Sequence, residues 1–406
     1  MLSRAATARV LQSLIEAEVK SARNRSSGAR SVRASTAGSW SEDLSMGRDD
    51  NAGLGLDSLE MMMVGSAINE MFHLYEGEQD LDPTAMDTFG DWLDAIEAAW
   101  ADGVSKMTFL TSGSTGLPKR CVHGAAVLNG EAGFLAGLFT SRRRIIALAP
   151  AHHIYGCLLT AFLADRLSVD VISGATSSPR FLNNGLLPGD LVVSFPDRWA
   201  AIDRTVSTWV ADVEGVVSTA PCPAPLMTSL IDRGLGGMTE LYGSSETAGI
   251  GWRRHPSDRY TLMPHWSFEN DRGEVAAGVR LRGLDGAVHD VPDTIERITD
   301  RAFTVGSRRD GAVQIGGINV WPQRIAAVLE QHPKVQAASV RVAQMPAGAR
   351  LKAFVVPVSS CAEEELSSDL ETWCRQRLSE VECPRIWTFG ATLPVNEFGK
   401  AADWRN

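Results

Sequence analysis

The sequence of 406 residues lacks the features of several protein classes. No apolar run reaches the roughly 18 residues that a membrane-spanning helix needs. The six cysteines form no C-x-x-C pair and no cluster with histidines, so neither a disulfide framework nor a zinc site is expected. We therefore expect a cytoplasmic protein without a membrane span. Any metal ion in it should be bound by oxygen atoms and arrive with a substrate.

Positive charge is missing from one long stretch. From Asp49 to Glu97 the chain carries thirteen Asp and Glu residues and not one Lys or Arg. The net charge of −10 is thus concentrated there, and the rest of the chain is close to neutral. An acidic module argues against nucleic acid as a partner and favours basic proteins. A solvated acidic face that binds nothing is the alternative.

The first part of the chain has helical periodicity. Apolar residues recur at helical spacing over 10–23, again after Asp57, and over 88–100, which predicts a small all-α bundle in residues 1–98. The acidic Glu16 within the first of these patterns argues against a transit peptide.

The rest of the chain has a different residue pattern. Over 105–306, short β-branched runs alternate with helical stretches, which predicts an α/β layered domain with buried strands. These runs lie at 144–150, 168–174, 190–196 and 214–221. Residues 307–406 are predicted to form a separate, small α+β unit. Its expected elements are a strand at 312–316, a helix at 322–332, strands at 336–343 and 351–358, a helix at 362–379 and a strand at 385–389.

One short motif indicates phosphate binding. "TSGSTGLPK" spans Thr111 to Lys119 and follows the strand-like "KMTFL". Hydroxyl groups and glycines in quick succession let N–H and O–H groups converge on phosphate oxygens, while a lysine neutralises charge. The spacing differs from G-x-x-x-x-G-K-[ST], so a P-loop NTPase is disfavoured.

Further motifs follow in order. They are "PAHHIYG" (150–156), "STAP" (218–221), "LYGSSETAG" (241–249), "GSRRDG" (306–311) and "LPVNEFGK" (393–400). With the phosphate loop, this ordered set resembles the superfamily of adenylate-forming enzymes, which includes acyl- and aryl-CoA ligases, luciferases and peptide-synthetase adenylation domains. The resemblance covers about residues 105 to 406. It implies a truncated AMP-binding large domain over 105–306 and a small C-terminal lid domain over 307–406.

The resemblance implies a two-step reaction. A carboxylate attacks the α-phosphate of ATP and pyrophosphate leaves, and a thiol then takes the acyl group from the acyl-AMP. Both partners of the first step are anionic, so catalysis requires positioning and charge stabilisation. The implied cofactors are ATP and Mg²⁺, a hard cation that carboxylate oxygens such as those of Glu246 would hold.

The resemblance also assigns site residues. The implied nucleotide-binding residues are Thr111, Ser112, Gly113, Ser114, Thr115, Gly116, Lys119, Tyr242, Gly243, Ser245, Asp293 and Arg308. Lys400 would bridge the carboxylate and the α-phosphate, and Asp310 would be the hinge on which the small domain swings. Gly316 and Gly317 would let a pantetheine arm pass close to the backbone. His153 matches the position of a histidine at the acyl pocket; a buried structural histidine is the alternative.

A second resemblance concerns residues 1–98. "LGLDSLE" is similar to the attachment motif of acyl carrier proteins, in which Ser58 would carry 4′-phosphopantetheine. A phosphodiester at a helix N-terminus is favoured by the dipole and by free N–H groups. The alternative is that Asp57 is only an N-cap and Ser58 its neighbour.

Three hypotheses for function follow. The leading one is a ligase of a biosynthetic pathway that loads an aryl or acyl acid onto its own or a partner's carrier domain. Its partners would be the carboxylic acid, a phosphopantetheinyl transferase and a downstream acyltransferase or ketosynthase. The first alternative is an acyl-CoA ligase that releases free acyl-CoA. The second is a non-enzymatic carrier or scaffold with a degenerate adenylation domain.

Overall fold

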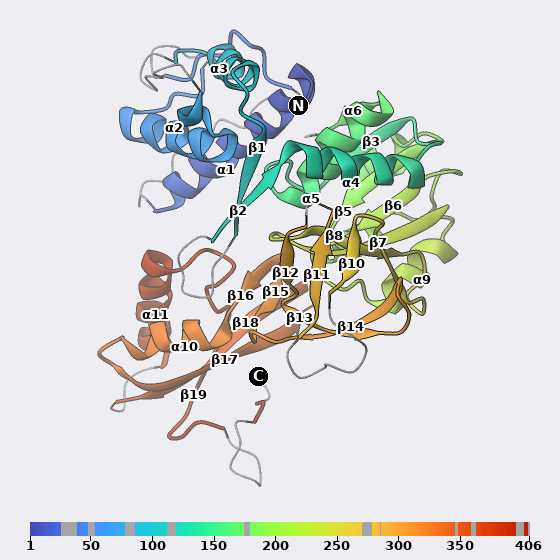
Figure 1. Cartoon of the computed structure of the whole chain (residues 1–406). Helices are drawn as coiled ribbons and strands as arrows, with labels where there is room; N and C mark the ends of the chain where they lie inside the picture. Colours follow the sequence, from blue (N-terminus) through green and yellow to red (C-terminus); the bar gives the residue numbers. More distant parts are fainter. Residues whose placement is uncertain are drawn as a thin grey trace. The chain divides into compact units, whose positions relative to one another are not determined.

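A computed structural model describes most of the chain. It covers residues 1–25, 39–47, 53–77, 86–111, 119–173, 179–269, 278–284, 286–345, 348–358, 363–394 and 402–404. The chain divides into two compact units. The first comprises Met1–Leu110, Arg120–Asp290 and Glu296–Thr304, and the second comprises Thr111–Lys119, Val291–Ile295 and Val305–Asn406. Figure 1 shows the elements of each.

The first unit begins with helices. They are α1 (Arg4–Arg25), α2 (Ser58–Phe72), the short η1 (Leu74–Glu76) and α3 (Phe89–Ala101). The starts of α2 and α3 follow from their capping residues. The Asp57 carboxylate accepts from the Leu59 and Glu60 amides, and the Glu60 side chain accepts from the Asp57 amide in return. Thr88 makes the same reciprocal arrangement at α3. Such capping boxes satisfy amides that a helix start leaves open.

A nine-stranded sheet follows, in the order β13-β14-β9-β8-β7-β6-β5-β3-β4. The run from β4 to β7 is parallel, whereas β8, β9 and β14 join antiparallel. Its strands are β3 (Arg144–Ala147), β4 (Asp170–Ile172), β5 (Asp190–Ser194), β6 (Glu214–Val217), β7 (Gly237–Ser244), β8 (Ala248–Arg253), β9 (Tyr260–Leu262), β13 (Asp293–Arg297) and β14 (Ala302–Arg308). Every residue of β5 is buried, as expected for a central parallel strand.

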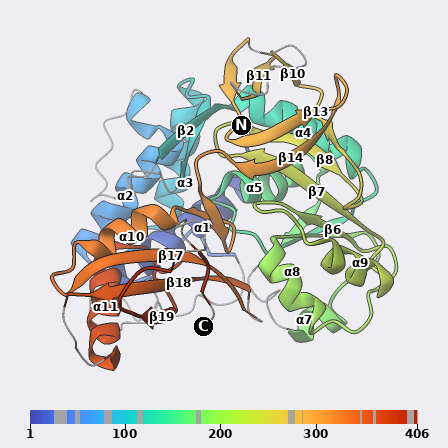
Figure 2. The ribbon, with the colours of Figure 1, turned by 90° about the horizontal axis from the view of Figure 1, so that it is seen from below.

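Helices pack against this sheet in two groups. One group is α7 (Pro179–Asn184), α8 (Pro196–Asp203) and α9 (Ala224–Asp232), which lie together in Figure 2. Trp199 of α8 is fully buried against Val192 and Met238 of the sheet. The other group is α4 (Ala125–Leu138), α5 (Ile154–Cys157), η3 (Leu158–Phe162) and α6 (Leu163–Leu167). The last three form one continuous helical run after the "PAHH" segment.

The smaller sheets of this unit are short. Strands β1 (Lys106–Thr111) and β2 (Lys119–Gly124) pair with each other. A three-stranded antiparallel sheet is made of β10 (Trp266–Phe268), β11 (Arg280–Gly283) and β12 (Val288–Asp290). Because β1 and β2 pair, they bring the two ends of the "TSGSTGLPK" motif together.

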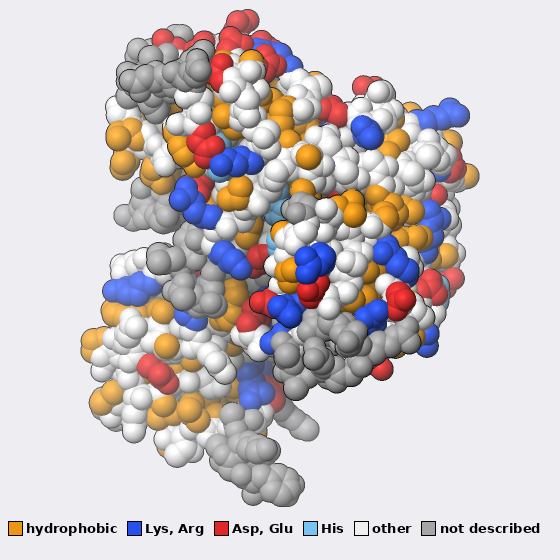
Figure 3. Space-filling view, viewed as in Figure 1, with side chains coloured by type: hydrophobic (Ala, Val, Ile, Leu, Met, Phe, Trp, Pro, Cys, Tyr) orange, Lys and Arg blue, Asp and Glu red, His pale blue; other side chains and the backbone are white. Residues whose placement is uncertain are grey.

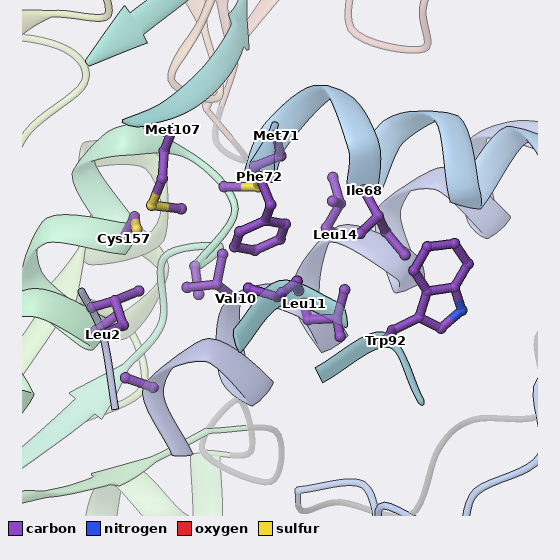
Figure 4. Packing of buried hydrophobic residues seen from close by; sticks show 14 of the residues in the cluster. Leu2, Val10, Leu11, Leu14, Ile68, Met71, Phe72, Trp92, Met107 and Cys157 are labelled. Carbon is purple, nitrogen blue, oxygen red and sulfur yellow. The ribbon is translucent and has the colours of Figure 1, made fainter. Parts of the chain in front are cut away.

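The N-terminal helices share a hydrophobic core with the α/β part of the first unit. Leu11 of α1 and Phe72 of α2 belong to the same buried cluster as Leu128 of α4 and Cys157 of α5. Figure 4 shows Phe72 among residues of α1, with Met107 and Cys157 nearby. The cluster runs across positions 98 to 105, where the sequence predicts a domain boundary.

The second unit holds a small α+β fold. Its elements are β15 (Val313–Ile315), β16 (Ile318–Val320), α10 (Pro322–Glu330), β17 (Val335–Met345), β18 (Gly348–Pro357), α11 (Glu363–Arg377) and β19 (Ile386–Phe389). Strand β18 lies between antiparallel β17 and parallel β19. One core joins Ile325 of α10 and Leu370 of α11 to Val355 of β18. All of them except β16, which was not predicted, match the elements expected over 312–389 within about three residues at each end.

Only some of the apolar residues of α2 lie on its buried face. Val64, Ile68, Met71 and Phe72 are buried. Leu59 is 69% and Met62 is 61% exposed, and Figure 3 shows hydrophobic side chains on the surface over α2. The sequence prediction of a helix here is confirmed, but its apolar stripe points partly to solvent.

The described helices include none that is both long and apolar enough to cross a lipid bilayer.

The shared core predicts which elements a cavity at α2 would destabilise. Phe72→Ala removes a fully buried ring and should lower the free energy of unfolding by about 3–5 kcal/mol. Hydrogen exchange of amides in α4 and η3 should accelerate together with that of α1. Leu59→Ala, at a position 69% exposed, is the control and should change stability by less than about 0.5 kcal/mol. Faster exchange confined to residues 1–98 would contradict a common core.

Candidate active site

The "LYGSSETAG" motif forms a tight hairpin between β7 and β8. The Ser244 amide donates to Thr247 Oγ1 at 3.2 Å, and the Thr247 amide donates to Ser244 Oγ at 3.3 Å. Ala248 follows with φ of 57°, a left-handed conformation. A Cβ on Gly243 would lie 2.1 Å from the Ala248 carbonyl oxygen, so only glycine fits there. The turn therefore holds Ser245 and Glu246 at the tip of a rigid hairpin.

Tyr242 lies one residue before the close approach, on β7. Its ring packs against Tyr260 of β9 and Phe303 of β14, with centroids 5.6 and 5.8 Å away. Tyr260 and Phe303 stack on each other at 5.6 Å. This aromatic cluster fixes the strand from which the hairpin tip projects.

A buried histidine holds the tip of the hairpin. His123 of β2 is 6% exposed, and its Nε2 donates to the Ser245 carbonyl oxygen at 2.7 Å. Burial lowers the pKa of His123, which the bond to Ser245 and the charge of Glu246 only partly oppose. Glu246 itself is half-buried.

A buried carboxylate holds the far side of the turn. Both oxygens of Glu131, on α4, accept the Gly249 amide, at 3.0 and 3.1 Å. The Gly249 carbonyl oxygen in turn accepts His265 Nε2 at 3.1 Å and Trp266 Nε1 at 2.7 Å. Desolvation raises the pKa of Glu131 to about 7, although the hydrogen bond from Gly249 opposes this.

His153 stands at the start of α5, where sequence reasoning expects the acyl pocket. Its side chain reaches solvent, and the protein around it lowers the pKa of the imidazole by desolvation. The ring lies 4.3 Å from that of His152. Helix α5 contacts β8, so the histidine and the hairpin belong to neighbouring elements.

Helix α1 orients this histidine pair. The Ser13 hydroxyl accepts the Ala151 amide at 3.1 Å and is hydrogen-bonded to His152 Nδ1 at 2.8 Å. Desolvation lowers the pKa of His152 to about 3, which keeps the ring neutral. Arg9 adds a bond to the Thr160 carbonyl oxygen at 2.6 Å. Helix α1 thus helps to hold the segment that carries His153 in place.

The second unit contains another group of the residues expected from sequence. Asp293 begins β13, and Arg308 ends β14. Arg308 pairs with Asp310 through two bonds, Nε to Oδ1 at 2.9 Å and Nη2 to Oδ2 at 2.6 Å. Partial burial alone would raise the pKa of Asp310, but Arg308 and the Ala312 amide outweigh it and lower the pKa. Asp310, the expected hinge residue, and Arg308, an expected nucleotide contact, therefore form an ion pair with each other.

Gly316 and Gly317 connect β15 to β16. Their φ values are 58° and 80°. A two-residue hairpin loop with positive φ at both positions matches the twist of its strands and strongly favours glycine. The loop geometry accounts for both glycines, and their expected role beside a pantetheine arm stays a prediction.

Several expected residues lie outside the described part of the chain. They are Ser112, Gly113, Ser114, Thr115, Gly116 and Lys400. Thr111 ends β1 and Lys119 begins β2, at the two ends of the phosphate loop. The described residues contain no group of three or more His, Cys, Asp or Glu side chains that could cage a metal ion.

The C-terminal part of the chain matches a known family model. Residues 324–400 match the AMP-binding enzyme C-terminal domain. A 4-coumarate–CoA ligase of Halorhodospira halophila is 36% identical over 347 residues, which are 85% of this chain and 87% of that protein. The chain belongs to the adenylate-forming family of acyl-CoA ligases.

Two further comparisons agree with this assignment. A 4-coumarate–CoA ligase of Cereibacter sphaeroides is 32% identical over 417 residues, covering all of this chain and 97% of that protein. Among solved structures, o-succinylbenzoate CoA synthetase of Bacillus subtilis aligns with a TM-score of 0.58 at 20% identity. That alignment covers 73% of this chain and 67% of the synthetase. The fold of an adenylate-forming ligase, an α/β core with a small C-terminal domain, is thereby confirmed.

The N-terminal carrier domain is not shown by these relatives. The alignment with the C. sphaeroides protein includes residues 1–98, so this segment has a counterpart in a protein named as a CoA ligase. The superfamily prediction is confirmed, whereas attachment of phosphopantetheine at Ser58 stays a prediction.

Sequence reasoning missed His123, Glu131, His265 and Ser13. Three of them act through a partner more than a hundred positions away, such as Ser245 for His123 and Gly249 for Glu131, whereas His265 is 16 positions from Gly249. A single histidine or glutamate within an ordinary helix or strand pattern carries no signal of such a partner.

Glu131 predicts a specific pH dependence of stability. Its folded pKa of about 7 exceeds the usual value of 4.5, so between these pH values the folded state holds a proton that the unfolded state has lost. The free energy of unfolding therefore falls as pH rises through this window, by up to about 3 kcal/mol from this group. Glu131→Gln, neutral at every pH, should lack that fall. Urea titrations of both proteins at pH 5 to 8 measure the difference, and parallel curves would contradict the assignment.

Proposed function

We propose that the protein is an AMP-forming acyl-CoA ligase that activates an aryl carboxylic acid and transfers it to free coenzyme A. The observation that carries the proposal is the alignment over the whole chain with a protein named 4-coumarate–CoA ligase. The protein of Halorhodospira halophila with the same name supports it at 36% identity. We therefore favour the hypothesis that free acyl-CoA is released over the hypothesis that a carrier domain is loaded.

The proposed first half-reaction joins the acid to the α-phosphate of ATP. A carboxylate oxygen attacks phosphorus, the bond to the bridging oxygen breaks, and pyrophosphate leaves with that electron pair. Thr111, Lys119 and the loop between them would hold the phosphates, and Lys400 would neutralise charge at the reacting atoms. Tyr242, Gly243 and Ser245 would line the nucleotide site from the hairpin. Asp293 and Arg308 would contact the ribose and phosphate.

The hairpin fits a magnesium ion bound through phosphates. Glu246 offers one hard carboxylate at the tip of a rigid turn, and His123 beside it is held neutral by burial. Mg²⁺ is usually held by one or two carboxylates together with substrate phosphates and water, and not by an all-protein cage. When bound, the ion would neutralise the leaving pyrophosphate. Glu246 would be its protein ligand.

The second half-reaction makes the thioester. The thiol sulfur of coenzyme A attacks the acyl carbon, the bond to the AMP oxygen breaks, and the thiol proton is released. Asp310 would be the hinge, and Gly316 with Gly317 would pass the pantetheine arm. His153, at the start of α5, would stand at the entrance to the acyl pocket. Its ring is neutral and lies against His152, which Ser13 binds. The side chain could therefore change conformation at the pocket entrance without burying a charge.

A carrier role for residues 1–98 is the second candidate. Ser58 is exposed at the N-terminus of α2, as an attachment site requires. Against it, Asp57 already caps the amides of that helix end, and Glu60 is bound to Arg23 of α1 at 2.7 Å. The helices of this segment also share their core with α4 and α5. The CoA ligase proposal needs neither a phosphopantetheinyl transferase nor a downstream acyltransferase or ketosynthase.

The proposed activity predicts products that can be measured directly. The protein with ATP, Mg²⁺, coenzyme A and a panel of aryl acids including 4-coumarate should form the acyl-CoA thioester, AMP and pyrophosphate. Lys400→Ala should lower acid-dependent pyrophosphate–ATP exchange by roughly 10² or more, because a charge-stabilising group at the reacting atoms is lost. No exchange with any acid in the panel would contradict the proposal and favour a scaffold.

Ser58→Ala separates the two ligase hypotheses. Under the CoA ligase proposal the variant should make thioester at the wild-type rate within about twofold, since surface substitutions seldom matter. Intact mass after coexpression with a phosphopantetheinyl transferase should be that of the unmodified chain. A gain of roughly 340 Da from a thiol-bearing prosthetic group, lost in Ser58→Ala, would support the carrier instead.

A further inference from the structure

The backbone of Gly249 is held from two sides. Its amide is accepted by Glu131 from α4, and its carbonyl oxygen accepts His265 and Trp266. On the opposite side of the turn, His123 holds the Ser245 carbonyl oxygen. Glu246 lies between these two fixed points, so its main chain has little freedom to move.

Burial of Glu131 is costly and calls for a function. The residue is 2% exposed, and α4 otherwise buries apolar side chains such as Leu128 and Leu135. An ionisable group in such surroundings costs free energy that an apolar residue of similar size would avoid. Its carboxylate contacts the Gly249 amide at 3.0 Å and lies 3.8 Å from His265 Nε2. Burial lowers the pKa of that imidazole, so it does not act as a strong cation.

The glycine is matched to the carboxylate. A Cβ on Gly249 would lie 2.3 Å from Glu131 Oε1 and 2.9 Å from the sulfur of Met263. Gly249 pairs with Gly243 in the β7–β8 register, so both strands of the hairpin approach closely here. A side chain at this position would push the carboxylate away and release the amide that it holds.

We infer that Glu131 is a positioning residue for Glu246: by holding the Gly249 amide, it fixes the hairpin that presents the proposed magnesium ligand. The inference rests on the proposed function, in which Glu246 serves Mg·ATP. Glu131 touches neither nucleotide nor acid. Its loss should therefore weaken the use of Mg·ATP and spare the use of the carboxylic acid.

Steady-state kinetics of the full chain test this division. Glu131→Ala and Gly249→Ala should each raise the KM for Mg·ATP roughly tenfold or more, the range seen when a residue supporting a metal ligand is lost. The KM for the acid should stay within about twofold. Glu131→Gln keeps the shape and one acceptor oxygen and should recover most of the wild-type value. The double variant should be less impaired than the product of the single effects, because both remove the same contact.

Glu240 offers a matched control. It is 1% exposed and lies at the base of the same hairpin, where it pairs with Arg253 at 2.7 Å and accepts the Cys222 amide at 2.9 Å. Glu240→Ala should lower the melting temperature as Glu131→Ala does and leave the KM for Mg·ATP near wild type. An equal rise of this KM in Glu240→Ala would overturn the inference, because it would report general loosening.

Hydrogen exchange separates failure of the inference from failure of the proposed function. In Glu131→Ala, amides of residues 244–250 should exchange faster, while those of β5 and β6 should be unchanged. Unchanged exchange at 244–250 would overturn the inference whatever the activity. A wild-type protein without acid-dependent pyrophosphate exchange would refute the proposed function and with it the link to magnesium, even if the hairpin still responded. Faster exchange with an unaltered KM for Mg·ATP would also overturn it.

Discussion

The buried contact between helix α1 and the helical run that begins at Ile154 is the constraint on which the candidate site depends. Apolar residues of α1 and α2 complete a core with α4, α5 and η3, so the first hundred residues form part of the α/β fold. Polar bonds add direction to this packing: Ser3 binds Asp165, Arg9 binds the Thr160 carbonyl and Ser13 binds His152. The segment that carries His153 is therefore fixed by residues more than a hundred positions earlier.

The β7–β8 hairpin shows the same principle on a smaller scale. Its motif supplies the residues that face the proposed nucleotide, but the turn is rigid because side chains from β2 and α4 hold its backbone. Gly243 and Gly249 allow this approach since neither position has room for a Cβ. The conformation of this motif thus depends on supporting residues outside it, and these residues are buried and ionisable.

Much of the fold could be predicted from the sequence because the decisive signals are local. β-Branched runs gave the parallel strands β3 to β6, and helical periodicity gave α10 and α11, each close to its observed bounds. The capping box at Asp57 likewise follows from neighbouring residues. What could not be predicted depends on tertiary contacts. The Met-rich face of α2 gave no sign of which side would be buried, and neither Glu131 nor His123 belongs to a motif. The resemblance to carrier proteins depended on the short motif "LGLDSLE" in an acidic helical segment, and a helix cap accounts for its Asp57 as well.

The link from Ser13 to the histidine pair has an evolutionary consequence. A recombination event that exchanged the first hundred codons would bring in one half of a packed interface without the other, and would leave His152 without its hydroxyl partner on α1. Related proteins are therefore expected to inherit the two segments together. A change in one segment should be followed by a compensating change in the other.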